Sequence, residues 1–67
     1  MLLKDLKTDE QAILLAAPQV LPQYLRPGKR VRMVTSRPEL TLVESEGQGF
    51  ALSEYLASHI IVIRAPT

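Results

Sequence analysis

A tight turn followed by an alternating segment constrains the fold of this 67-residue chain more than any other feature. Pro27 restricts its own φ and Gly28 permits a sharp turn, so the chain changes direction at this point. Residues 29–35 then alternate, with Val31 and Met33 on one side of the segment. This alternation predicts a strand with one buried face, entered through the turn.

Four other segments of similar length are predicted to be strands: Gln11–Ala16, Leu40–Ser45, Gln48–Leu52 and residues 59–63. The first is almost continuously apolar, which favours a strand buried on both faces, although a helix would share this pattern. The last is apolar on both faces, so we expect it to pair at the centre of the sheet or to cover another segment. In Gln48–Leu52, Phe50 and Leu52 share one face, and Gly49 indicates a bulge or a close approach of two backbones.

Turns and short helical pieces account for the rest of the chain. The glycine after Glu46 predicts a hairpin turn, because glycine readily takes the positive φ that tight hairpins need. Two prolines limit the connector, residues 17–24, to about one helical turn. Ser53 is a good N-cap for a short 3₁₀ turn after it. We predict an all-β fold, a small SH3-like barrel of about five strands with a short helical or 3₁₀ turn, forming one domain over residues 1–67.

The composition restricts the class of protein. Cysteine is absent, which excludes disulfides and thiolate metal sites and is compatible with a reducing cytosol. Only two tyrosines and one phenylalanine are aromatic, so aliphatic side chains must supply a core near the lower size limit for independent folding. No apolar run approaches the roughly 20 residues of a membrane span, and the first residues, Asp5 among them, are unlike a signal peptide. We expect a cytoplasmic protein that can associate peripherally with the inner face of the plasma membrane.

No arrangement of residues predicts catalysis. The chain has one histidine and no cysteine, and an activated nucleophile needs a base within reach. Glu44 and Glu46 share a strand face, but carboxylates at a hairpin tip are ordinarily solvated. His59 stands alone beside an apolar strand, and its spacing from Glu54 is not that of a metal site. We therefore expect no enzyme activity, no cofactor and no bound metal.

The strongest charge feature is a basic cluster around the turn, formed by Arg26, Lys29, Arg30, Arg32 and Arg37. One interpretation is a solvated strand face in which Arg30 and Arg32 pair with Glu44 or Glu46. A second is contact with a protein or with membrane headgroups. A third is nucleic-acid binding, with Tyr24 as a stacking platform. The net charge of +1 disfavours a nucleic-acid partner.

Two apolar groups are candidates for an interaction surface. The first belongs to the connector and consists of Val20, Leu21, Tyr24 and Leu25. The second lies in the last predicted strand, where Ile61 and Ile63 point outward if their even-numbered neighbours face the core. The alternative for these two isoleucines is that they pack under the leucines of residues 2–6.

The order of these motifs resembles the FeoA family, small cytosolic accessory proteins of bacterial ferrous-iron transport. An opening Leu-x-x-Leu-Lys segment starts at Leu3, and a Leu-x-Pro-Gly turn starting at Leu25 opens a strand of the form x-x-Val-x-Met-Val. A later strand ends in Phe50-Ala51-Leu52-Ser53, and the closing segment is similar to that of the family through Ala57, Ile60 and Val62. The chain is divergent, because its connector is shortened and lacks the family's Leu-Gly motif.

The resemblance implies a non-enzymatic binding protein that docks on the cytosolic, GTP-hydrolysing part of a ferrous-iron permease of the FeoB type and promotes Fe²⁺ uptake. Apolar anchors ringed by charges are typical of protein interfaces. We predict that the partner-binding residues are Leu21, Tyr24, Leu25, Arg26, Lys29 and Arg37. The alternatives are a small structural subunit that self-associates or joins a larger assembly, and a nucleic-acid-binding SH3-like barrel.

Overall fold

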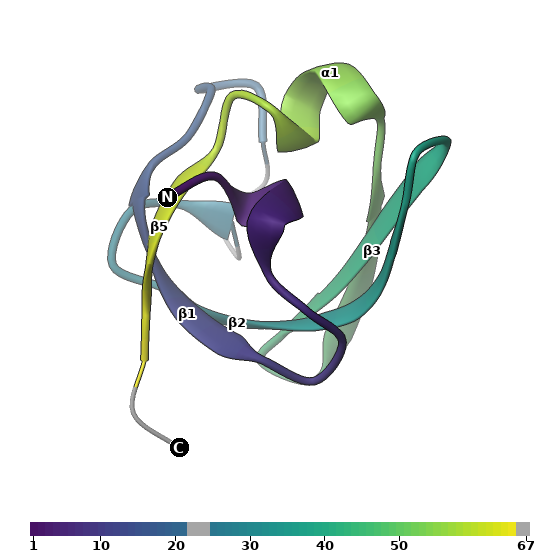
Figure 1. Cartoon of the computed structure of the whole chain (residues 1–67). Coiled ribbons are helices and arrows are strands. Elements are labelled where there is room, and N and C mark those ends of the chain that lie inside the picture. Colours follow the sequence, from purple (N-terminus) through teal and green to yellow (C-terminus); the bar gives the residue numbers. More distant parts are fainter. Residues whose placement is uncertain (22–24, 66–67) are drawn as a thin grey trace.

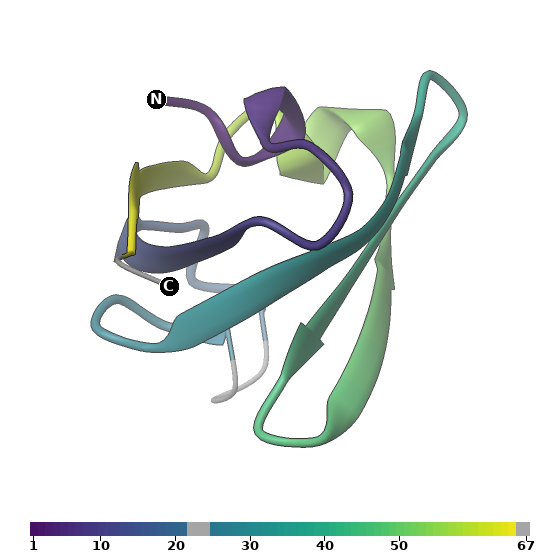
Figure 2. The same ribbon diagram turned by 60° about the horizontal axis from the view of Figure 1, so that its bottom comes forward.

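A computed structural model describes residues 1–21 and 25–65 and shows one five-stranded antiparallel sheet that curls on itself (Figure 1). In chain order the elements are a 3₁₀ turn (Leu3–Asp5), β1 (Gln11–Ala16), β2 (Arg30–Arg37), β3 (Leu40–Ser45), β4 (Gln48–Leu52), α1 (Glu54–Ala57) and β5 (Ile61–Arg64). The strands follow the spatial order β4-β3-β2-β1-β5. Figure 2 shows the hairpin of β3 and β4 on one side of the molecule and β1 with β5 on the other. The predicted all-β fold is confirmed.

The core is built from aliphatic side chains that come from every strand and from the segments between them. Its buried members are Leu3, Leu6, Ala12, Leu14, Leu21, Leu25, Val31, Met33, Val43, Leu52, Ile60 and Val62. The alternation predicted for β2 is confirmed, because Val31 and Met33 both lie in this core. Phe50 packs against the core and is only partly buried. A domain this small buries a limited share of its surface, so its stability depends on this cluster.

Strands β1 and β5 each have only one buried face, so the prediction that both faces of β1 are buried is wrong. In β1, Leu14 is buried while Leu15 is 53% exposed beside a bulge in the pairing with β5. In β5, Val62 is buried while Ile61 and Ile63 are 43% and 55% exposed. The sheet covers a single core, so alternate residues of each strand point away from it. Ile60 and Val62 face the core, so the condition for outward-pointing isoleucines is met. β5 lies at the end of the sheet and not at its centre.

The buried face of β3 carries two polar residues. Thr41 and Ser45 point inward together with Val43, whereas Leu40 is exposed. The register between β3 and β4 is unbroken, and nothing lies within 4 Å of a Cβ placed on Gly49, so the predicted bulge or close approach at this glycine is wrong. The sheet bends at shifts in the β2–β3 and β1–β5 registers.

The predicted turn residues take the expected local conformations. Glu46 and Gly47 both have positive φ, 53° and 79°, which is the signature of a two-residue type I′ hairpin turn. The Ser53 hydroxyl accepts a hydrogen bond from the Leu56 N–H at 3.2 Å and caps α1. This piece is one turn of α-helix, in agreement with the predicted short helical or 3₁₀ turn.

The first residues of the chain cover the outer edge of β5. The N–H of Val62 donates to the carbonyl oxygen of Met1 at 2.8 Å, and the N–H of Leu3 donates to that of Ile60 at 2.9 Å. The Met1 amine in turn donates to the Val62 carbonyl at 3.0 Å. Figure 1 shows this start of the chain alongside β5. The pairing also holds Leu3 over the core, where its side chain is fully buried.

Two neighbouring leucines test the one-sided burial of β1. Leu14→Ala is expected to lower the free energy of unfolding by about 2–5 kcal/mol, because it leaves a cavity in the core. Leu15→Ala removes the same atoms from an exposed site and is expected to change it by about 0.5 kcal/mol or less. Urea unfolding followed by circular dichroism measures both. Equal losses in the two variants would contradict the assignment of faces.

Candidate functional site

Two of the predicted partner-binding residues serve the protein's own core. The side chains of Leu21 and Leu25 are 6% and 0% exposed, and both belong to the central hydrophobic cluster. The prediction that they are apolar anchors on the surface is therefore wrong as to their position. Tyr24 lies outside the described residues. Leu21 and Leu25 instead attach the two ends of a short segment to the core, and Val20 beside it is 81% exposed.

The three predicted basic residues do not form one cluster. Arg26 is exposed in the turn before β2, and Lys29 close by makes an ion pair with Glu46 at 3.2 Å. Arg37 ends β2. An eight-residue strand separates its two ends by roughly 20 Å or more. Arg37 therefore belongs to a different end of the barrel from Arg26 and Lys29.

Most of the other basic side chains on the sheet have acidic or polar partners. Arg32 lies between two carboxylates, with its guanidinium 2.8 Å from Asp9 and 3.4 Å from Glu44. Arg64 contacts Glu10 at 2.9 Å, and Arg30 donates to the Gln11 side-chain oxygen at 2.8 Å. The predicted cross-strand pair of Arg32 with Glu44 is confirmed. The pairing of these arginines favours the interpretation of a solvated strand face over that of a polyanion-binding surface.

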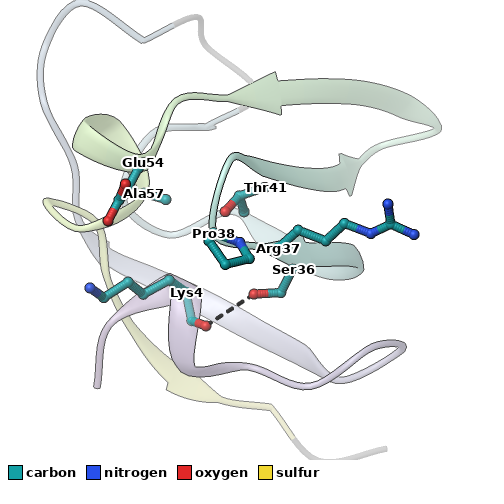
Figure 3. Close-up of a pocket in the computed structure, with 7 residues that line it drawn as sticks. All are labelled: Lys4, Ser36, Arg37, Pro38, Thr41, Glu54 and Ala57. Atoms are coloured by element: carbon teal, nitrogen blue, oxygen red, sulfur yellow. Dashed lines mark hydrogen bonds between the residues drawn. The ribbon is translucent and has the colours of Figure 1, made fainter.

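A pocket of about 290 Å³ lies at the end of the barrel that carries Arg37. It is lined by Lys4, Ser36, Arg37, Pro38, Thr41, Glu54 and Ala57 (Figure 3). The Ser36 hydroxyl donates to the Lys4 carbonyl oxygen at 3.2 Å and joins the end of β2 to the 3₁₀ turn. Figure 3 shows Lys4 and Glu54 on one side of the pocket, while the guanidinium of Arg37 extends away from it on the other.

The chemistry of this pocket suits a small polar group of a partner. Its volume is at the lower end of the range for small-molecule sites. Thr41 at its floor is buried and offers a hydroxyl, while Lys4 and Glu54 place opposite charges at the rim. Such a lining can accept a hydrogen-bonding side chain, but it brings no nucleophile into contact with a base.

The single histidine follows α1 and is held against residues of that turn. The Nδ1 atom of His59 lies 2.7 Å from the Tyr55 carbonyl oxygen and 3.3 Å from the Ser58 hydroxyl, and the rings of His59 and Tyr55 are 4.3 Å apart. Within residues 1–21 and 25–65, no group of three or more His, Cys, Asp or Glu side chains could hold a metal ion. No helix in the same part of the chain is long and apolar enough to cross a membrane.

These features define the class: a small curled β-sheet of the SH3-like kind, with a pocket and charged surfaces at its ends. No family model and no curated protein matches the chain. A crystal structure of FeoA described as an iron uptake regulatory protein matches with a TM-score of 0.81 at 18% identity, over 97% of both chains.

A second match is FeoA from Stenotrophomonas maltophilia, solved with zinc, with a TM-score of 0.76 and 24% identity over 94% of this chain and 89% of that one. That protein is described as a prokaryotic SH3-domain protein with a suggested role as a bacterial ferrous iron transport activating factor. At these identities the matches establish the fold. The sequence-based prediction of a FeoA-like, SH3-like barrel is confirmed at that level.

The ion pairs of Arg32 lead to a prediction about nucleic acid. The chain is expected to show no binding to a mixed-sequence oligonucleotide at physiological salt, because this guanidinium is already neutralised. The double variant Asp9→Asn/Glu44→Gln frees Arg32 and is expected to gain weak binding that disappears as salt is raised. Fluorescence anisotropy against salt concentration measures both. Tight, steeply salt-dependent binding by the unmodified chain would contradict this interpretation of the basic face.

Proposed function

We propose that this chain is a non-enzymatic accessory protein of ferrous-iron transport that docks on the cytosolic part of a permease of the FeoB type. The observation that carries the proposal is the match of nearly the whole chain to two FeoA structures, one of them described as an iron uptake regulatory protein. In one case the match spans 97% of both chains. Docking on a permease would place the chain at the inner face of the plasma membrane.

The docking surface that we propose is centred on the segment between β1 and β2. Leu21 and Leu25 attach this segment to the core, so the exposed Val20 and Arg26 stand on an anchored support. Such support reduces the ordering cost that a free loop incurs when it binds. Lys29 adds a second cation that is half-exposed in its pair with Glu46. Tyr24 remains a predicted contact, and Arg37 remains a predicted charge at the other end of the barrel.

The proposal is tested by affinity capture of the tagged chain from its own detergent-solubilised, nuclease-treated cell extract. Mass spectrometry of the captured proteins is expected to identify a permease of the FeoB type. Capture of a different membrane or soluble complex without a permease would overturn the proposed function while leaving the fold intact. Capture from an untreated extract that is lost from the nuclease-treated one would instead favour the nucleic-acid alternative.

Variants of the docking surface give the corresponding prediction. Val20→Asp/Arg26→Glu is expected to reduce permease capture at least tenfold, because it places two negative charges on the proposed surface. Its thermal unfolding should be unchanged, since both side chains are exposed. The matched control Lys7→Glu reverses an exposed charge outside this segment and is expected to leave capture intact. Leu25→Ala is unsuitable as a probe, because it removes a core side chain.

A further inference from the structure

The outer edge of β4 presents unpaired backbone groups. β4 is the last strand of the sheet, and among the described residues it pairs with β3 alone. Gly49 and Ala51 are both exposed, and no backbone hydrogen bond joins either of them to any other described residue outside the β3–β4 ladder. In Figure 2 this green strand lies on the margin of the molecule. A further strand could therefore form backbone hydrogen bonds along this edge.

The register identifies which groups point outward. Ser45 and Gln48 flank the two-residue type I′ turn and therefore form a hydrogen-bonded pair. Hydrogen-bonded and non-bonded pairs alternate along the ladder, so Val43 with Phe50 is bonded and Glu44 with Gly49 is not. By the same alternation Ala51 does not bond to β3. The N–H and carbonyl groups of Gly49 and Ala51 consequently point away from β3, in the plane of the sheet.

The two edges of the sheet differ in this respect. The outer edge of β5 is occupied by residues 1–3, through three backbone hydrogen bonds of 2.8–3.0 Å. On β4, no segment within residues 1–21 and 25–65 pairs with the edge that faces away from β3. β4 also has no charged residue and no proline, the devices that commonly protect an edge strand from further pairing.

The charges at the two ends of β4 specify what kind of strand can pair there. Glu46 precedes β4 and makes an exposed ion pair with Lys29. Exposed ion pairs contribute little free energy, so Glu46 can exchange this partner for another cation. Glu54 follows β4, is exposed, and has no ion pair with any described residue. An added strand with basic side chains at its ends would meet a carboxylate at either end of an uncharged centre.

The same charges disfavour a second copy of this chain as the added strand. Antiparallel pairing of two β4 strands that joins Gly49 to Ala51 of the other copy is centred on Phe50. It brings Glu46 of one copy to the end of β4 that carries Glu54 of the other, and it does so twice. Like charges opposite one another across strands are destabilising.

We propose that the open edge of β4 binds an extended segment of a partner protein as a sixth strand, and that this segment carries lysine or arginine on both sides of an uncharged centre. The N–H and carbonyl groups of Gly49 and Ala51 would supply the backbone hydrogen bonds, and Glu46 and Glu54 the charge selectivity. This proposal shares with the proposed function only the premise that the chain is a binding protein. It does not depend on the partner being a permease.

Synthetic peptides test this proposal without any permease. The probe is a peptide of alternating valine and threonine with a lysine at each end, and the matched control has glutamate at each end. Titration of the ¹⁵N-labelled chain is expected to slow amide hydrogen exchange at Gly49 and Ala51 with the lysine peptide and to have at least tenfold less effect with the glutamate peptide. Equal binding of the two peptides, or shifts confined to another surface, would overturn the proposal.

A backbone variant isolates the role of the edge. Ala51→Pro removes an N–H that the β3–β4 ladder does not use, so the fold should tolerate it on this edge. The matched control Ala51→Val changes the side chain but keeps the N–H. Binding of the lysine peptide is expected to weaken at least tenfold in the proline variant and about twofold or less in the valine variant. Equal affinities of these two variants would contradict pairing at this edge.

A charge reversal keeps the test decisive if the proline variant fails to fold. Glu46→Lys/Glu54→Lys changes only exposed side chains and is expected to exchange the preferences for the two peptides. Unchanged preference would overturn the charge selectivity. Sedimentation of the unmodified chain checks the competing occupant, because a dimer that Ala51→Pro abolishes would show that a second copy fills the edge. If permease capture fails while the peptides bind as expected, the proposed function is refuted and the edge site remains.

Discussion

The structure depends on covering one face of a curved sheet with the few apolar side chains that a 67-residue chain can supply. Leu3, Leu25, Met33 and Ile60 come from different segments and are all fully buried. The chain has no cysteine, and the fully buried side chains among the described residues include no aromatic ring, so the free energy of folding rests on this aliphatic packing. The segments between strands are therefore part of the core, because they carry leucines that the strands alone do not provide.

This constraint explains why part of the site could not be predicted from the sequence. Leu21 and Leu25 lie in a proline-rich connector, where an apolar side chain is as compatible with an exposed anchor as with a core residue. Only the tertiary arrangement shows that both side chains are buried in the core. The same limit applies to β1, since Leu14 and Leu15 are indistinguishable by composition but lie on opposite faces. Burial is decided by what covers a strand, and a local pattern does not contain that information.

Local features were predictable where local chemistry decides the structure. The strand bounds Gln11–Ala16, Leu40–Ser45 and Gln48–Leu52 agree with the prediction because turn residues delimit each of them. The positive φ of Gly47 and the cap formed by Ser53 also follow from residue type. Gly49 shows the opposite case, because a glycine in a strand suggests a bulge or a close contact and this one has neither. Only the structure shows that Gly49 lies on the open edge of β4, where its N–H and carbonyl groups point outward.

The distribution of charge follows from the same shortage of core material. Every strand exposes one face, and on β2 that face carries Arg32, which pairs with Asp9 and Glu44. Such pairs keep the surface soluble but leave few side chains free to recognise a partner. The backbone N–H and carbonyl groups at a sheet edge can still bind a partner, because packing of the core does not use their hydrogen-bonding capacity. Residues 1–3 satisfy these groups on β5, and no described segment does so on β4. A barrel of this size can therefore bind a partner through its backbone, with the glutamates at the ends of the strand providing selectivity at no cost to the core.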